Sequence, residues 1–407
     1  MTDVVIIGAG SAGMTAAHRL TQAGANVTVL EARARVGGRT WSEPLENGEI
    51  AERGGEYFES SMTDVFELAE ELGLTMTTQG FNPTARPTTD PDGPGLEALA
   101  AASRTVVEHW AGLDRIGPDT SIQDVLDGAG LDPELAAVLR GRMSCHRSAL
   151  ISNISAYWSE GPESAAVEEE HHVRIRGGNQ QLAERMADRV GRERILLRRP
   201  VGRVEPDGAG YLVTGMTGET IRADAVIVAV PVGVLKQFEI EGLDPRTRAA
   251  IRKIGFGDAA KLHLAVRGEC PPGIRQDVSR PYSTWAPAAV GRSDAAYVTG
   301  FSATHETQRK LGIAEGPELF RRRLHADWPE LDFTGGSLFT YWGADPWTRG
   351  AYSYRPLGWS AENDEFIAAP NGRILFAGEH TADIHRSLIC GAIRSGERAA
   401  REALERL

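Results

Sequence analysis

Hydrophobic runs of strand length alternate with amphipathic stretches at both ends of the chain. Near the N-terminus, residues 4–7 predict a buried strand, residues 11–23 a helix and residues 26–30 a second strand. Near the C-terminus, residues 374–377 predict a strand and residues 390–404 the helix that follows it. Strands that alternate with helices in this way are typical of an α/β fold with a parallel sheet.

The turn between the first predicted strand and its helix carries the glycine pattern of a dinucleotide site. Gly8 permits a tight turn, Gly10 lets the backbone approach a pyrophosphate, and Gly13 lets the helix pack on the strand. The helix that begins at Ser11 then directs its first amides toward the anion. Glu31 ends the second strand, where its carboxylate can accept hydrogen bonds from both ribose hydroxyls. We therefore predict a Rossmann-like dinucleotide-binding domain.

The stretches that follow this acid distinguish FAD from NAD. An NAD site normally leaves the acid without a loop of glycines and arginines pressed on the pyrophosphate. Here "ARARVGGRTW" follows at once, and "AERGGEYF" supplies a second glycine pair. Such close-approach features suit a longer ligand that lies extended through the domain. We therefore predict FAD, with candidate contacts at Ala32, Arg33, Gly38, Arg39, Gly54, Gly55 and Glu56.

These N-terminal motifs resemble those of the flavin-containing amine oxidase family, which includes monoamine, polyamine and L-amino acid oxidases. The C-terminal stretch "GRILFAGEHTADIHRSLICGAIRSGERAAREAL" resembles the same family independently. The resemblance implies that Gly378, Glu379 and the turn of Gly391 and Ala392 hold the ribityl chain and the isoalloxazine ring. It also implies that the backbone of Val201 meets the adenine.

The resemblance covers nearly the whole chain and implies two domains, as in monoamine oxidase. A Rossmann-like FAD-binding domain is assembled from the separate segments 1–75, 176–250 and 345–407. Residues 76–175 and 251–344 form the substrate-binding domain, in which helices and strands are mixed. The expected class is therefore α/β, with an α+β substrate domain.

Three residues carry the chemistry that the resemblance implies. Lys261 matches the family's lysine, which reaches a water near flavin N5 and aids the reaction with oxygen; a lysine in such a strand is otherwise solvated. Trp342 and Tyr352 match aromatic residues near the flavin, and Tyr352 matches one wall of the aromatic cage. Monoamine oxidases link the flavin to a cysteine where this chain has Ala351, so we expect non-covalent FAD. The second cage wall falls on Leu388, which implies a differently shaped pocket.

The substrate itself is left open by the sequence. By its offset from the return to the flavin domain, His171 falls where the family lines the substrate cavity, although a surface position is as consistent. The acidic run 168–170 is either a solvated face or a partner for a cationic distal group, as in diamine and polyamine oxidation. The segment "GGEYF" lacks the "GxMR" pattern of L-amino acid oxidases, and nothing in the context of Arg86 singles it out as a carboxylate ligand.

Composition limits the partners. The net charge of −12 argues against nucleic acid or an anionic membrane as the main partner. The three cysteines are widely spaced and form no CxxC pair, so we expect neither a disulfide framework nor a metal site. Without a leader or a long apolar run, the chain is expected to be cytoplasmic, with a small-molecule amine and O2 as partners. Whether it forms a homodimer is left open.

The resemblance implies oxidation of an amine. Hydride passes from the α-carbon to flavin N5, O2 reoxidises the flavin with release of hydrogen peroxide, and the imine hydrolyses to a carbonyl compound. The alternatives are a flavin-dependent C–C desaturase or dehydrogenase, or an L-amino acid oxidase, acting on a specialised biosynthetic intermediate. A non-catalytic flavoprotein is a more remote alternative. Lys261, Trp342 and Tyr352 favour the amine oxidase.

Overall fold

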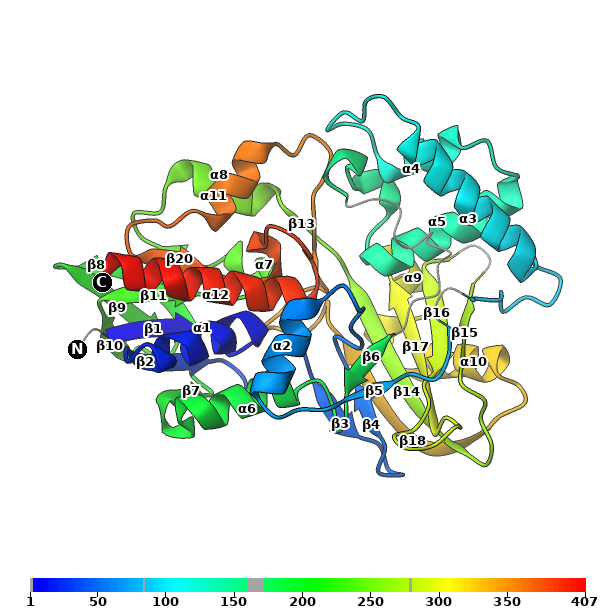
Figure 1. Cartoon of the computed structure of the whole chain (residues 1–407), viewed down its shortest axis with the longest axis horizontal. Helices are drawn as coiled ribbons and strands as arrows, with labels where there is room; N and C mark the ends of the chain where they lie inside the picture. Colours follow the sequence, from blue (N-terminus) through cyan, green and yellow to red (C-terminus); the bar gives the residue numbers. More distant parts are fainter. Residues whose placement is uncertain (1–2, 83–84, 160–171, 278–279) are drawn as a thin grey trace.

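The computed structural model describes residues 3–82, 85–159, 172–277 and 280–407 (Figure 1). A parallel sheet covered by helices forms one end of the molecule, and an antiparallel sheet with a group of helices above it forms the other (Figure 1). This arrangement confirms the α/β fold that the alternating pattern predicts.

The parallel sheet gathers strands from distant parts of the chain, in the order β20–β11–β1–β2–β7. The residues of β1 alternate between two cores: Val4 and Ile6 face one, and Val5 and Ile7 face the other. Burial on both faces explains why these strands are continuous apolar runs. The strands are β1 (Asp3–Ile7), β2 (Asn26–Glu31), β7 (Ile195–Leu197), β11 (Ala225–Val228) and β20 (Ile374–Phe376).

Helices cover one face of this sheet, and a second sheet with further helices covers the other. The first face carries α1 (Ser11–Gln22), α2 (Thr63–Glu71), α6 (Gln181–Val190) and α12 (Ile389–Arg406). The other face carries β8 (Val201–Asp207), β9 (Gly210–Gly215), β10 (Thr220–Ala223), β12 (Glu239–Ile240), α7 (Val232–Leu235), α8 (Pro245–Lys253) and α11 (Ala361–Ala368).

The antiparallel sheet has the order β15–β16–β17–β14–β18. Its strands are β14 (Ala259–Arg267), β15 (Gly273–Gln276), β16 (Tyr282–Ala286), β17 (Tyr297–Ala303) and β18 (Asp332–Tyr341), with α9 (His305–Lys310) and α10 (Glu318–Asp327) beside them. The helices α3 (Leu96–Ala111), α4 (Ile122–Gly128) and α5 (Pro133–Arg147) form the cyan group above the sheet (Figure 1). Short strand pairs join the two ends: β3 (Ser42–Pro44) with β4 (Ile50–Glu52), β5 (Met76–Thr78) with β6 (Val173–Ile175), and β13 (Gly255–Phe256) with β19 (Ser353–Tyr354).

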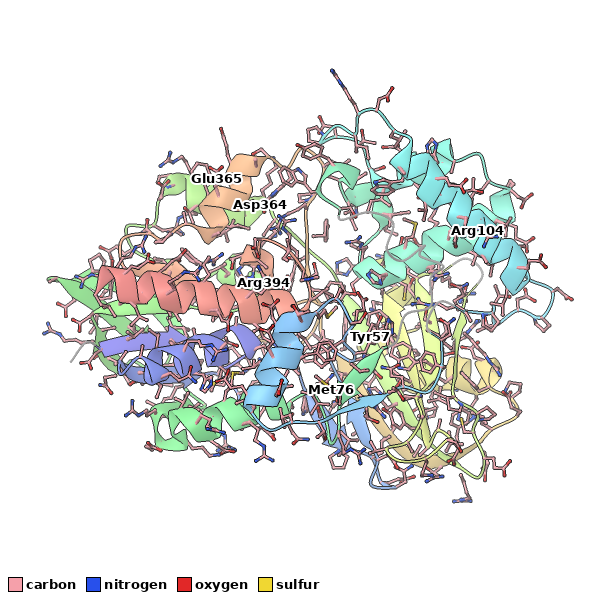
Figure 2. All side chains as sticks on the ribbon, viewed as in Figure 1. Tyr57, Met76, Arg104, Asp364, Glu365 and Arg394 are labelled. Atoms are coloured by element: carbon pink, nitrogen blue, oxygen red, sulfur yellow. The ribbon has the colours of Figure 1, made fainter. Side chains whose placement is uncertain are left out.

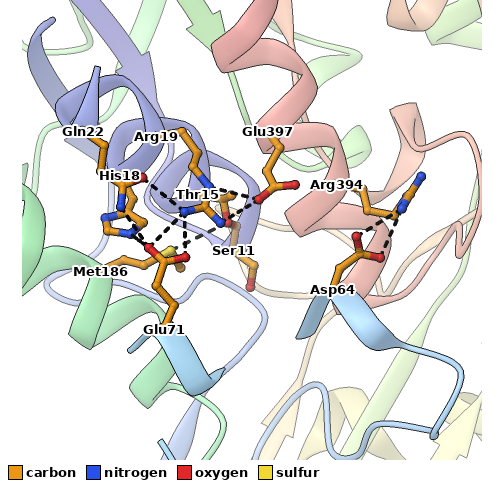
Figure 3. Close-up of polar contacts among 10 residues, drawn as sticks. All are labelled: Ser11, Thr15, His18, Arg19, Gln22, Asp64, Glu71, Met186, Arg394 and Glu397. Carbon is orange, nitrogen blue, oxygen red and sulfur yellow. Dashed lines mark hydrogen bonds and ion pairs between the residues drawn. The ribbon is translucent and has the colours of Figure 1, made fainter. Parts of the chain in front are cut away.

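Polar side chains connect three of the helices that cover the parallel sheet (Figure 3). Arg19 of α1 contacts Glu71 of α2 at 2.7 Å and Glu397 of α12 at 2.8 Å. His18 adds a contact of 2.8 Å to Glu71. Partial burial opposes ionisation of this carboxyl, but hydrogen bonds from Arg19 and His18 outweigh it and lower the pKa of Glu71 to about 2.

This lowered pKa predicts an acid-sensitive contribution to stability. A carboxyl whose pKa in the folded state lies below its ordinary value of 4.5 stabilises the fold above that value, and the contribution is lost as the pH falls to about 2. We expect Glu71→Gln to lower the unfolding temperature at neutral pH and to unfold like the original chain near pH 2. A thermal unfolding series over pH checks this, and a difference that stays constant down to the lowest pH would contradict it.

Candidate active site

A cavity of about 830 Å³ lies between the carboxyl ends of the parallel strands and the antiparallel sheet. The turn after β1, the end of β2 and the loop after it form one part of its wall, and β14, β16 and α5 contribute to the other. Ligands of open α/β sheets bind in the crevice at this end of the strands.

The glycine turn after β1 is closely packed and leaves helix amides open to the cavity. A Cβ on Gly13 would lie 1.9 Å from the carbonyl oxygen of Gly8, and a Cβ on Gly8 would lie 2.6 Å from that of Ala229. Gly10 is the N-cap of α1 and supplies no capping side chain, and Ser11 behind it lines the cavity. This cradle fits a pyrophosphate, because the amides of the first turn need an acceptor.

Glu31 connects two loops at the end of β2. One carboxylate oxygen accepts the backbone N–H of Ala9 at 2.7 Å, and the other accepts that of Arg33 at 2.8 Å. The side chain lines the cavity and is 4% exposed. Each oxygen retains a second lone pair, so the group can also accept from ribose hydroxyls.

The loop that follows Glu31 is held by charge pairs to the C-terminal part of the chain. Arg33 pairs with Asp345, and Arg39 contacts Glu379 at 3.0 Å. Burial opposes ionisation of Glu379, but the charge of Arg39 and a hydrogen bond from Ser353 lower its pKa below the ordinary value. The two halves of the predicted FAD site thus form one network.

The three predicted catalytic residues lie in the wall of this same cavity. Lys261 is 4% exposed rather than solvated, and its Nζ donates to the backbone oxygen of Gly54 at 2.7 Å. Trp342 donates its indole N–H to the backbone oxygen of Arg53 at 3.0 Å. The hydroxyl of Tyr352 donates to the backbone oxygen of His146 at 2.6 Å.

An aromatic pair that the sequence did not single out also lines the cavity. Tyr57 stacks on His172 with ring centroids 3.8 Å apart and an interplanar angle of 12°. Tyr57 lies near the middle of the molecule, between the two large sheets (Figure 2). Tyr57 belongs to the "GGEYF" segment, so its place directly after the second glycine pair is the sequence signal that could have identified it. Further lining residues that the sequence did not identify are Arg86, Cys145, His146, Trp285 and Phe301.

The predicted site residues that the structure describes line one cavity, with two exceptions. Gly13 and Gly391 do not line the cavity, because both serve close packing: a Cβ on Gly391 would lie 2.2 Å from the carbonyl oxygen of His385. His171 and the acidic run 168–170 lie outside the described residues. The predicted residues that line the cavity are Gly8, Gly10, Ser11, Glu31, Ala32, Arg33, Gly38, Arg39, Gly54, Gly55, Glu56, Val201, Lys261, Trp342, Tyr352, Gly378, Glu379, Leu388 and Ala392.

The chemistry of the cavity wall predicts that FAD is bound without a covalent bond. Ala351 lines the cavity and has no nucleophilic side chain. Burial raises the pKa of the Cys145 thiol to about 12, which keeps this lining cysteine protonated and unreactive. We expect acid precipitation to release all the flavin into the supernatant, as measured by absorbance. A coloured pellet that survives washing would contradict this prediction.

Among the described residues, no three or more histidine, cysteine, aspartate or glutamate side chains are grouped in a way that could hold a metal ion. No helix in this part of the chain is long and apolar enough to cross a bilayer.

Comparison with known proteins connects this geometry to one family. A sequence model of "flavin containing amine oxidoreductase" matches residues 11–106 and 139–404. The chain is 28% identical over 468 residues to putrescine oxidase of Kocuria rosea, an alignment that covers 99% of this chain and 95% of that protein. It is 27% identical over 438 residues to lysine-specific histone demethylase 1 homolog 3 of Oryza sativa subsp. japonica, covering 98% of this chain and 53% of that protein. The chain thus spans about half the length of that relative.

A similar fold occurs in a solved structure of putrescine oxidase bound to putrescine. The TM-score is 0.85 at 23% sequence identity, with 100% of this chain and 99% of the other covered.

Proposed function

The chain belongs to the family of flavin-containing amine oxidoreductases, and we propose that it oxidises a small-molecule amine to an imine with O2 as the electron acceptor. FAD is the cofactor, and the protein is an FAD-dependent oxidoreductase of amines. FAD, when bound, would supply the acceptor for a hydride from the α-carbon, and the amine nitrogen would release one proton, so that two electrons and two protons in all would reach O2 and give hydrogen peroxide. The imine then reacts with water to give a carbonyl compound.

The residues proposed to hold FAD are those of the glycine cradle and its extension. The amides after Gly10 bind the pyrophosphate, and Glu31 accepts from the ribose. The start of α12, whose N-cap Leu388 supplies no capping side chain, directs amides into the cavity near Ala392. A helix N-terminus there favours negative charge on the nearby ligand.

The residues proposed to act on the amine exclude water and orient it. Tyr57 and Tyr352 contribute aromatic surface, and Leu388, which matches the family's second cage position in sequence, contributes an aliphatic surface. A water-poor wall favours the neutral amine over the ammonium, so hydride can leave without a strong base. Burial and the charge of Arg147 lower the pKa of His146 well below its ordinary value, so this cavity residue is neutral as well.

The observation that carries the proposal is the meeting of two independent features in one cavity. The dinucleotide cradle of β1 and β2 opens into the same space as Lys261, Trp342 and Tyr352. A buried cation beside the place where oxygen gains electrons stabilises the charge that develops there. That combination favours amine oxidation over C–C desaturation, which the sequence alone leaves open as an alternative.

An anaerobic absorbance experiment tests the proposal. Pools of primary amines, secondary amines and polyamines are added one at a time to the FAD-loaded protein. We expect one pool to bleach the flavin band, and air to restore the band with release of peroxide. A band that every pool leaves unchanged, in protein that sodium dithionite still reduces, would overturn the proposal.

A further inference from the structure

A buried carboxylate and a buried ammonium form an ion pair in the wall of the cavity. Nζ of Lys261 lies 2.6 Å from Oε2 of Glu56, and the two side chains are 5% and 4% exposed. Nζ also donates to the backbone oxygens of Glu52 at 3.1 Å and Gly54 at 2.7 Å. Oε1 of Glu56 accepts the indole N–H of Trp285 at 2.9 Å. The three N–H groups of the ammonium therefore have three protein acceptors, and one of them carries the compensating charge.

The charged and titratable groups around this pair come from several elements. Burial raises the pKa of Glu52 to about 7, against hydrogen bonds from Asn179 and Ser42. Burial, with the charge of Lys261 as the next cause, lowers the pKa of His263 well below its ordinary value and leaves it neutral. The other groups nearby are Arg53 after β4, Arg174 on β6 and Tyr297 on β17.

Glu56 is therefore the carboxylate that directly compensates the ammonium. Burial without a counter-ion favours the neutral form of a lysine, and removing one partner of a buried pair leaves the other charge uncompensated. The remaining contacts of Nζ are two backbone oxygens and the ring of Trp285, whose centroid lies 5.3 Å away, and none of these groups carries a full negative charge.

We infer that Glu56 is a positioning residue of the redox site. It keeps the Lys261 ammonium charged and in place, so that Lys261 continues to assist oxygen reduction at pH values where a buried lysine without a counter-ion would be neutral. This inference rests on the proposed function, in which Lys261 acts on oxygen. In the reoxidation step, two electrons and two protons pass from reduced FAD to O2, which yields oxidised FAD and hydrogen peroxide. Lys261 and Glu56 end the step with the protons they began with.

The test needs no amine. FAD-loaded protein is reduced by light and EDTA without oxygen and mixed with aerated buffer, and the return of the flavin band is timed from about pH 6 to about pH 9. We expect the wild-type rate to vary much less over this range than the rate of Glu56→Gln, although Glu52 titrates within the range. In Glu56→Gln, Lys261 has no counter-ion and should lose its proton as the pH rises. Above the midpoint of that proton loss, the reoxidation rate should fall about tenfold per pH unit. The rate of the double variant Glu56→Gln/Lys261→Arg should again vary as little as the wild-type rate, since a guanidinium stays charged without a counter-ion.

Controls separate this role from a merely structural one. Lys261→Met should be slow at every pH. Glu71→Gln removes another carboxylate that contacts basic side chains (Figure 3). Glu71 does not line the cavity, so the reoxidation rate of this variant should match that of the wild type. A Glu56→Gln profile as flat as the wild-type profile, or a Lys261→Met rate equal to the wild-type rate, overturns the inference. This test uses no amine, so it can be interpreted even if no amine pool bleaches the flavin in the experiment that tests the proposed function.

A second readout uses the FAD-free protein. The unfolding temperature is measured for Glu56→Gln, Lys261→Met and the double variant Glu56→Gln/Lys261→Met. We expect the double variant to lose less than the sum of the two single losses, because removing both charges leaves none uncompensated. Additive losses would show that the pair is not energetically coupled and would overturn the inference, even where a variant fails to bind FAD.

Discussion

Replacing Gly54 with alanine is expected to leave the purified protein without bound FAD. A Cβ at this position would lie 1.7 Å from the carbonyl oxygen of Arg39 and 3.2 Å from the ring of Trp342. Since the nearer atom belongs to the backbone, the two loops must move apart. That movement displaces Arg39, which contacts Glu379, and the backbone oxygen that accepts from Lys261. Overpacking costs about 3 kcal/mol or more here, which is about a 100-fold loss of FAD affinity.

Titration of the FAD-free protein with FAD, followed by flavin fluorescence, measures this loss. Gly335→Ala is a matched control, because a Cβ on this exposed strand residue meets no atom within 4 Å and its backbone does not require glycine. We expect the control to bind FAD as the original chain does. A Gly54→Ala protein that binds FAD with unchanged affinity would show that the two loops can separate without disturbing the site.

Sequence patterns predicted well those parts of the site that are formed by residues close together in the sequence. The strand, turn and helix that carry Gly8, Gly10 and Gly13 are local, because the apolar period and the glycine spacing both lie within thirty residues. The predicted helix 390–404 is similarly local and differs from α12 only at its ends. For these elements, the spacing of apolar residues and glycines in the sequence is enough to predict the backbone conformation.

The substrate side of the cavity could not be predicted in the same way, because its contacts join residues far apart in the chain. The stack of Tyr57 on His172 and the ion pair of Glu56 with Lys261 each connect two segments far apart in the chain, and the pattern of neither segment identifies its partner. Lys261 lies in an apolar strand, a context that by itself suggests a solvated edge. Its burial becomes intelligible only once Glu56 is known to face it.

The aromatic surface of the cavity includes more residues than the sequence singled out. The replacement of a cage ring by Leu388 predicted a differently shaped pocket. The structure adds aromatic rings from other segments to the same cavity, among them Tyr57, Trp285 and Phe301. These rings come from separate strands and loops, so no single position of the sequence indicates that they share one cavity.

Glu31→Gln is expected to weaken FAD binding by about one to two orders of magnitude. The carboxylate accepts one backbone N–H from the glycine turn and one from the arginine-bearing loop, so it connects the two loops that form the cradle. An amide of the same size has one acceptor oxygen, and its NH2 group must face a backbone N–H. A lost hydrogen bond to a charged group costs about 1.5–3 kcal/mol, which corresponds to about 10–150-fold in affinity.

The same fluorescence titration measures this effect, with Asp188→Asn as the matched control. Asp188 is an exposed carboxylate that pairs with Arg192 on the surface, away from the cavity lining, so its loss should leave FAD affinity unchanged. If Glu31→Gln bound FAD as tightly as the control, the two backbone contacts would stabilise only the loops themselves. The affinity for FAD would then depend on the helix amides and the glycine approach, and the acid at the end of β2 would have no part in selecting the ligand.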